Sequence, residues 1–306
     1  MRASTLAWIC LSQAIGGATP AFTKLALAGL GPWTLVVVRQ VLGTLLLLVL
    51  ASLRPGGLHA GRGGGLRRGA FTRRDLGLVL LLSWAGFALP QILNALGLAL
   101  SSATNGALLS PLEPIGILLG GALLLGERLT PPRVAAVTLG LAGAILIVLQ
   151  GRVPGGGGDL RGDLLMALGH LAWAIYTLAA KPLLERHDPL HVAILAGLLS
   201  PLPLLPLALS EHLDTAAAVP ALGWIVALAL LSTALGTLAW NRGLAHVSAA
   251  TMATFVFLQP LVGLAIGTLG LGEPVGGLAL LGTGLIVAGV VIAALRGEKE
   301  PAACRT

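Results

Sequence analysis

The chain has 306 residues, of which 56% are hydrophobic and only 10% are Asp, Glu, Lys or Arg. Soluble domains carry about 25% charged residues, so this composition excludes a soluble domain. The formal net charge of +7 does not indicate a nucleic-acid partner, because the basic residues lie in short segments between long uncharged stretches and form no solvated basic face.

The uncharged stretches are long enough to cross a lipid bilayer, which takes about 20 residues of helix. Helices are expected because a membrane-spanning chain must pair its backbone groups internally, and no alternating barrel pattern is present. The first stretch contains Pro20 and is too long for a cleaved signal peptide. The sequence predicts an all-α polytopic membrane protein with ten transmembrane helices, at residues 4–28, 32–53, 76–98, 102–124, 131–151, 163–183, 190–210, 220–241, 248–271 and 275–295.

Two basic residues lie within the first two predicted helices. Lys24 is near the end of the first, where it either contacts the substrate or extends its ammonium group to the membrane surface. Arg39 lies roughly 12 Å into the second helix by helical rise. Its guanidinium either binds a substrate carboxylate or pairs with an acid inside the bundle. Both residues are therefore candidates for substrate binding or coupling.

The predicted helix at 102–124 contains the most informative acid, Glu113, which is followed by Pro114. Proline removes a backbone hydrogen bond and can open the helix. A carboxylate in lipid is costly unless it is paired or protonated, so Glu113 is a candidate for binding a proton or a cationic substrate. The alternative is an ion pair with a basic residue such as Arg39. The amides of Gln91 and Asn94, in the preceding helix, are further candidates for substrate contacts.

The second half of the chain contributes aromatic and amide candidates. Trp173 and Tyr176 are one turn apart in the sixth predicted helix, and the amides of Asn241 and Gln259 lie in the eighth and ninth. His170 is expected to be a hydrogen-bonded core histidine rather than a proton relay.

No metal site or cofactor is expected. Cys10 and Cys304 lie at opposite ends of the chain, and the glycines at Gly155–Gly158 lack the GxxxxGK[ST] pattern of a phosphate-binding loop. The predicted helices contain no nucleophile with a base at suitable spacing, so an enzyme is not expected either.

The second half repeats the spacing of the first. Lys24 and Pro32 recur at a fixed offset as Lys181 and Pro189. A further set recurs at a second, slightly shorter offset, with Gly97, Ser102, Pro114, Gly126, Glu127 and Gly143 matched by Gly243, Ser248, Pro260, Gly272, Glu273 and Gly289. The offset shrinks because the first half carries the longer loop, at 54–75. Each repeat would hold five helices, an odd number, so the two copies would be inverted in the membrane. This is the plan of secondary transporters, whose substrate site lies near the midplane between the halves.

The charges of the loops predict the orientation. Segments on the side of the N-terminus contain 15 Lys and Arg residues and those on the opposite side contain two, so both termini are expected in the cytoplasm and the protein in the cell (inner) membrane. The predicted domains are a first repeat at 1–151 with a basic cytoplasmic loop at 54–75, a glycine-rich extracytoplasmic linker at 152–162, a second repeat at 163–296 and a cytoplasmic tail at 297–306.

Several of the repeated residues are expected to have structural roles. Glu127 and Glu273 follow glycines at the ends of the fourth and ninth predicted helices, and we expect them to accept backbone N–H groups at the start of the fifth and tenth. Close helix packing is expected at two small-xxx-small pairs. The structural set comprises Glu127, Glu273, Pro114, Pro260, Gly116, Gly120, Gly263 and Gly267.

Long stretches of the sequence resemble the EamA domain of the drug/metabolite transporter superfamily. The signature of this domain that runs from its fourth helix to its fifth resembles two stretches here, EPIGILLGGALLLGERLTPPR (Glu113–Arg133) and QPLVGLAIGTLGLGEPVGG (Gln259–Gly277). Also similar are LLSTALGTLAWNRGLAHVSAA (Leu230–Ala250), GHLAWAIYTLAAK (Gly169–Lys181) and the pair Lys24 and Arg39. The resemblance covers nearly the whole chain as two EamA domains. It implies a ten-helix bundle that moves small metabolites by exchange or proton coupling, without an ATPase. The halves differ where Gln259 replaces Glu113 and Pro274 replaces Arg128, so they are not expected to be chemically equivalent.

The sequence therefore predicts a secondary active transporter that exports amino acids or related amphipathic solutes. One alternative is a proton-coupled exporter of organic cations or drugs attracted by Glu113, and another is a non-transporting membrane scaffold. The expected partners are a small-molecule substrate, membrane lipid and either protons or a counter-substrate. No oligomeric state is specified by the sequence.

Overall fold

The computed structural model describes residues 3–53, 71–125, 131–150, 159–256 and 258–297. Every regular element within these ranges is helical, which confirms the predicted all-α class. The first half contains α1 (Ala3–Ala26), α2 (Pro32–Ser52), α3 (Arg73–Leu81), the π-helical η2 (Leu82–Ala88), α4 (Leu89–Leu100), α5 (Ala103–Leu108), α6 (Leu112–Leu125) and α7 (Pro131–Gln150). The second half contains α8 (Leu160–Leu184), α9 (Pro189–Leu199), α10 (Leu205–Ser210), α11 (Thr215–Ala227), η3 (Leu228–Gly236), α12 (Thr237–Leu244), α13 (Ala249–Phe255), α14 (Leu258–Ala265), η4 (Ile266–Gly270) and α15 (Gly277–Gly297).

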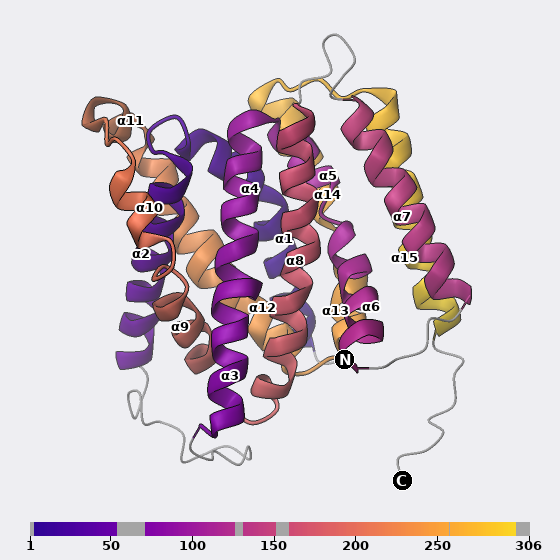
Figure 1. The fold of residues 1–306 in the computed structure, drawn as a ribbon, viewed down its shortest axis with the longest axis horizontal. Helices are drawn as coiled ribbons and strands as arrows, with labels where there is room; N and C mark the ends of the chain where they lie inside the picture. Colours follow the sequence, from indigo (N-terminus) through magenta and orange to yellow (C-terminus); the bar gives the residue numbers. More distant parts are fainter. Residues whose placement is uncertain (1–2, 54–70, 126–130, 151–158, 257, 298–306) are drawn as a thin grey trace.

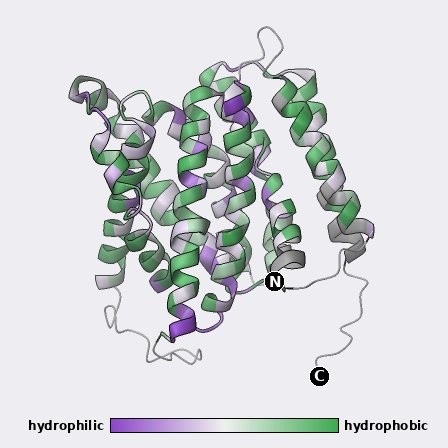
Figure 2. Ribbon diagram, in the orientation of Figure 1, coloured by the Kyte–Doolittle hydropathy of each residue, from purple (hydrophilic) through white to green (hydrophobic). Residues whose placement is uncertain are grey.

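The helices consist of hydrophobic residues over most of their length (Figure 2). Large hydrophobic side chains such as Ile145, Val219 and Leu269 are exposed. Four continuous helical segments are long and apolar enough to cross a membrane, at Pro32–Ser52, Arg73–Leu100, Leu160–Leu184 and Thr215–Leu244. Exposed apolar side chains are compatible with a lipid environment, because lipid tails are as apolar as leucine side chains.

Three of the predicted helices are interrupted where the sequence suggests continuous ones. The segment 102–124 divides into α5 and α6, the segment 190–210 divides into α9 and α10, and the segment 248–271 divides into α13, α14 and η4. At the first break Pro111 lacks the N–H group that a continuous helix would need, and Leu109 and Ser110 form the turn. The π-helical segments η2 and η3 lie within two other long helices. Irregular backbone at membrane depth is tolerated where it is buried in protein or lines a cavity.

The helices pack side by side as a single bundle, shown in Figure 1. α1 lies inside it and contacts α4, α5, α11, α12, α13, α14 and η3. α8 has the corresponding place in the second half, with contacts to α3, α4, α6 and η2. α7 and α15 pack against each other at one edge of the bundle (Figure 1). The inner helices of both halves therefore surround the middle of the molecule.

The element boundaries recur along the chain with the spacing found in the sequence. The starts of α8 and α9 follow those of α1 and α2 at the same offset that separates Lys24 from Lys181. The starts of η3, α13, α14 and α15 follow those of η2, α5, α6 and α7 at the offset that separates Pro114 from Pro260. The duplicated sequence thus folds into corresponding series of elements. The match is not complete, because α2 is continuous where α9 and α10 are separate, and α6 has no counterpart of η4.

Small residues permit close contacts between inner helices. A Cβ atom at Gly116 of α6 would lie 2.8 Å from the Leu171 carbonyl oxygen of α8. A Cβ atom at Gly263 of α14 would overlap Ala107 of α5 and lie 3.0 Å from the Gly17 carbonyl oxygen of α1. The second glycines of the two predicted pairs, Gly120 and Gly267, would likewise meet Leu178 and Thr104.

One end of the bundle is held by a polar cluster around Asp75. Its side chain forms a capping box with Thr72 at the start of α3. The carboxylate also lies 2.8 Å from Arg186 Nη2 and 3.5 Å from His187 Nε2, in the turn between α8 and α9. Phe71 stacks on the His187 ring with a centroid distance of 4.0 Å. These contacts join the start of α3 to the end of α8.

Candidate functional site

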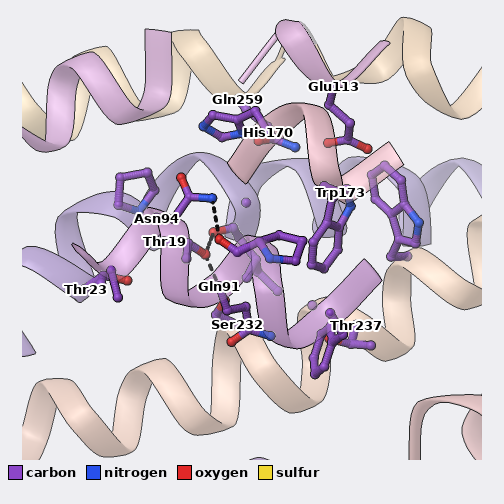
Figure 3. A pocket seen from close by; sticks show the side chains of 18 of the residues that line it. Thr19, Thr23, Gln91, Asn94, Glu113, His170, Trp173, Ser232, Thr237 and Gln259 are labelled. Atoms are coloured by element: carbon purple, nitrogen blue, oxygen red, sulfur yellow. Dashed lines mark hydrogen bonds between the residues drawn. The ribbon is translucent and has the colours of Figure 1, made fainter. Parts of the chain in front are cut away.

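A pocket lies among the inner helices, lined by residues from both halves of the chain. It encloses about 890 Å³ of space between atoms, its open mouth included. Its lining comes from α1, α2, η2, α4, α6, α8, η3, α12 and α14. Figure 3 shows several of these side chains gathered around the pocket.

Glu113 reaches the pocket from the first turn of α6, directly after the break that follows α5. Its N–H group donates to the Ser110 carbonyl oxygen at 3.0 Å, and Pro114 falls in the first helical turn, where its missing N–H group costs nothing. The side chain is 3% exposed, and its Oε1 atom has no hydrogen-bond partner. The helix dipole favours a carboxylate in this first turn.

Gln259 occupies the equivalent place in α14 and lines the same pocket (Figure 3). Its N–H group donates to the Val256 carbonyl oxygen at 2.9 Å, which repeats the contact of Glu113 with Ser110. Its side-chain Nε2 donates to Gln13 Oε1 at 2.7 Å. The pocket is thus lined by a hydrogen-bonded amide from the second repeat and by a carboxyl oxygen without a hydrogen-bond partner from the first.

Arg39 reaches the pocket from α2 and is 5% exposed. Its Nε donates to Thr233 Oγ1 at 3.0 Å, and its Nη2 donates to Ser232 Oγ at 2.8 Å. Both hydroxyls belong to η3, and Ser232 also accepts a hydrogen bond from Thr19. Among the described residues, no ion pair joins Arg39 to Glu113. The alternative of a strut between these two charges is therefore not what the structure forms.

The predicted amides of α4 also line the pocket. Asn94 Nδ2 donates to the Pro90 carbonyl oxygen at 2.8 Å, whereas Gln91 Oε1 is buried without a hydrogen-bond partner. Gln91 therefore has an acceptor available for a ligand.

Aromatic rings form one wall of the pocket, which we call the aromatic wall: Phe87, Trp173 and Trp240. The Trp173 centroid lies 5.9 Å from that of Phe87 and 6.3 Å from that of Trp240. Trp240 Nε1 is buried without a hydrogen-bond partner. The wall offers apolar surface with one free donor.

Tyr176 and Asn241 lie behind the aromatic wall and do not line the pocket. The Tyr176 ring stacks on Trp173 with a centroid distance of 5.0 Å. Its hydroxyl donates to Asn241 Oδ1 at 2.9 Å, and both residues are fully buried. They position the wall, so the expectation that they contact a substrate directly does not match their place in the fold.

Lys24 does not line the pocket either. Its Nζ donates to the carbonyl oxygens of Leu98 and Ser101, at 2.7 and 2.6 Å, at the end of α4. Lys181, its match in the second half of the chain, donates in the same way to Leu244 and Val247 at the end of α12. A cation favours this position because helix C-termini carry unpaired carbonyls and negative dipole charge.

Glu273 accepts backbone hydrogen bonds at the start of a helix, but not of the helix expected. Its carboxylate accepts from Ala103 N at 2.9 Å and from Thr104 N at 2.7 Å, which caps α5 rather than α15. The prediction of its partner was wrong because the nearest helix in sequence is not the nearest in space. Glu127 lies outside the described residues.

His170 lines the pocket, and its Nε2 lies 2.8 Å from the Gly106 carbonyl oxygen. Other lining residues were not among the sequence candidates. Most of the hydroxyl residues gave no sequence signal, because serine and threonine are common in apolar helices and can bond their own backbone. Those that were missed are Ser12, Thr23, Ser232 and Thr237. Within the described part of the chain, no group of three or more His, Cys, Asp or Glu side chains is placed to hold a metal ion.

Comparisons with known proteins find the same family over both halves. The EamA-like transporter family matches residues 3–149 and 160–295. A relative from Streptantibioticus cattleyicolor, named "Probable terminal-alkyne amino-acid exporter", is 32% identical over 72% of this chain and 73% of its own. A "Probable amino-acid metabolite efflux pump" of Salmonella typhimurium is 27% identical over 56% of this chain and 60% of its own.

Two further comparisons cover more of the chain. The "Uncharacterized transporter YdeK" of Bacillus subtilis is 29% identical over 92% of this chain and 93% of its own. A solved crystal structure aligns with a TM-score of 0.63 at 19% identity, over 98% of this chain and 100% of the other, which shows a shared fold.

Proposed function

The chain belongs to the EamA-like transporter family, as its sequence resemblance suggested, and from this premise we propose a secondary active transporter that exports amino acids or related amphipathic metabolites. The family and its apolar helices make it a multi-pass membrane protein of a class that transports small molecules. We propose that the substrate occupies the pocket between the inner helices.

The observation that carries this proposal is a set of buried polar atoms around the pocket that lack hydrogen-bond partners. They are Gln91 Oε1, Glu113 Oε1 and Trp240 Nε1. Each such atom costs about 1–3 kcal/mol when it is buried unsatisfied. A bound solute with donors and an acceptor would remove these costs, and a scaffold without a ligand would have no reason to retain them.

The polar lining and the names of two relatives support amino acids as the substrates. Those relatives are named for amino-acid export and for efflux of amino-acid metabolites. An organic cation attracted by Glu113 is the competing substrate. Arg39 in the same lining disfavours it, because a cation alone would leave the guanidinium charge unbalanced.

We propose ten membrane-spanning helices, arranged as two inverted five-helix repeats at 1–151 and 163–296, with both termini in the cytoplasm and the protein in the cell membrane. The recurrence of element boundaries supports the duplication. The excess of Lys and Arg on the side of the termini supports the orientation. A substrate site between two such halves would open to each side in turn.

The experiment is transport by purified protein in liposomes. Vesicles with and without an imposed proton gradient receive a mixture of the twenty common amino acids, and the contents are measured by mass spectrometry. We expect accumulation of one or a few amino acids beyond that of protein-free vesicles. Flux of no amino acid above that background would contradict the proposed function.

We also propose that Glu113 carries the coupling proton, and Glu113→Gln tests this role in the same vesicles. Glutamine keeps the shape of the side chain but cannot ionise, so gradient-driven accumulation should be lost. Glu185→Gln is the matched control, since it makes the same chemical change at a side chain that is 61% exposed and outside the pocket. Normal proton-driven accumulation by folded Glu113→Gln would remove Glu113 from coupling.

A further inference from the structure

The pocket lining contains two buried ionisable groups, one basic and one acidic, that are not paired with each other. The guanidinium of Arg39 contacts two neutral hydroxyls, and the Oε1 atom of Glu113 contacts no hydrogen-bond donor. A buried charge in a medium of low dielectric constant is stable only when an opposite charge or strong hydrogen bonds compensate it. The side chains of the lining alone therefore leave both groups incompletely compensated.

The two groups lie on different sides of the pocket. Arg39 is bonded to Ser232, and Figure 3 shows Ser232 on the side opposite Glu113. Because Arg39 extends from α2 and Glu113 from α6, their backbones are held apart by the bundle. A ligand in the space between them can contact one group at each end.

The aromatic wall supplies the third feature. Trp173 lines the same pocket as Glu113 and contacts the rings of Phe87 and Trp240. Tyr176 and Asn241 fix this wall from behind through the 2.9 Å hydrogen bond between them. A rigid wall of three rings fits an apolar or aromatic side chain. A contact between aromatic rings stabilises a complex by about 0.5–1.5 kcal/mol beyond the contribution of the apolar area that it buries.

Resting on the proposed function, we propose that the pocket selects a zwitterion: the substrate carboxylate binds Arg39, its ammonium group binds Glu113, and its apolar side chain lies against the aromatic wall. A zwitterion compensates both buried charges at once and adds no net charge to the protein interior. A simple amine or a simple carboxylic acid compensates one and leaves the other. Gln259, the amide equivalent of Glu113, carries no negative charge, so it cannot compensate an ammonium charge as a glutamate carboxylate can.

The test is binding to detergent-purified protein, measured by isothermal titration, which does not depend on transport. The probes are L-phenylalanine, 3-phenylpropionate, which lacks the ammonium group, and 2-phenylethylamine, which lacks the carboxylate. The series is repeated with L-leucine, 4-methylpentanoate and 3-methylbutylamine, and the tighter amino acid defines the series. We expect it to bind at least about tenfold more tightly than either analogue, the loss typical of a buried charge left unpaired.

Two substitutions should change the ratios of the dissociation constants, amino acid against each analogue, in opposite ways. In Glu113→Gln the preference for the amino acid over the carboxylic acid should vanish, while the preference over the amine persists. Arg39→Gln should give the reverse pattern. Glu113→Asp and Arg39→Lys keep the charges and should retain most of both preferences, which separates charge recognition from loss of folding. Arg74→Gln, at an exposed residue outside the pocket, is the control.

Three outcomes would overturn the inference. The first is an amine or an acid that binds wild-type protein as tightly as the amino acid. The second is that Glu113→Gln and Arg39→Gln both bind the three probes with the same relative affinities as the wild-type protein. The third is binding of neither amino acid. Amino-acid flux in the liposome assay together with any of these results would leave the proposed function intact and refute the zwitterion site alone.

Discussion

At the scale of single residues, Glu113 and Gln259 show how a duplicated position can acquire two chemistries. Both follow a break and precede a proline in the first turn of a helix. Gln259 is satisfied by Gln13, whereas Glu113 Oε1 has no partner. The unequal halves expected from the sequence are therefore seen in the hydrogen bonding. The neutral amide of Gln259 forms a hydrogen bond within the protein, and the carboxyl group of Glu113 is available to a ligand or a proton.

Substitutions of Lys24 and Lys181 should destabilise the protein by similar amounts. Lys24→Met and Lys181→Met each leave two carbonyl oxygens at a helix end without a charged donor. The free energy of unfolding is expected to fall by about 1–3 kcal/mol in each case. We expect a lower Tm for both proteins in detergent, measured by differential scanning fluorimetry, and a smaller effect for Arg74→Met at an exposed position.

Substrate binding provides the control for this pair. Lys24→Met should bind the amino-acid probe as wild type does once it is folded, because Lys24 does not line the pocket. An unaltered Tm combined with lost binding in Lys24→Met would return Lys24 to the substrate site.

At the scale of elements, hydropathy and length were sufficient to predict where apolar helices lie, but not where they are interrupted. The break before Glu113 contains Pro111, which hydropathy does not register, whereas the break before Gln259 and the π-helical η2 and η3 contain no proline that would mark them. Polar side chains in apolar helices were a usable signal for Arg39, Gln91 and Asn94, which line the pocket. The same signal misplaced Tyr176 and Asn241, because their hydrogen bond joins residues 65 positions apart and no single helix reveals it.

Packing of α14 against α5 and α1 should depend on the absence of a side chain at Gly263. Gly263→Ala would place a methyl group against Ala107 and the Gly17 carbonyl oxygen. Overpacking of this kind costs about 1–3 kcal/mol. We expect a lower Tm for the purified protein, and weaker substrate binding because α14 also carries Gln259.

Gly284→Ala in α15 is the matched control, since a Cβ atom there would have nothing within 4 Å. It should leave Tm unchanged or raise it slightly, because alanine favours a helix by about 0.8–1.0 kcal/mol over glycine. Equal Tm values for the two variants would show that the close contact at Gly263 does not constrain the fold.

At the scale of the whole molecule, the duplicated halves and the asymmetric charges define how the bundle should lie in the membrane. α1 and α8 occupy corresponding places, and their lysines cap corresponding helix ends. The pocket draws residues from both halves. An inverted pair of halves would place this pocket at the same depth from either surface.

The orientation is tested with reporter fusions. A fusion after Gly155 should report the extracytoplasmic side and a fusion after Arg305 the cytoplasmic side, because the Lys and Arg excess lies on the side of the termini. The reporters are alkaline phosphatase, active outside, and green fluorescent protein, fluorescent inside. The reverse pair of signals would contradict this orientation, and two fusions reporting the same side would exclude an odd number of membrane-spanning helices between Gly155 and Arg305.

The central claim is that one pocket carries the solute by opening to each side of the membrane in turn. The direct measurement is labelling of Thr19→Cys, a pocket-lining position, in a background with Cys10 and Cys304 replaced by alanine. A membrane-impermeant maleimide is applied to right-side-out and to inside-out vesicles, with and without the transported amino acid. The account predicts labelling from both sides and slower labelling from both sides when the amino acid is present. Labelling from one side only, or labelling that the amino acid does not slow, would contradict it.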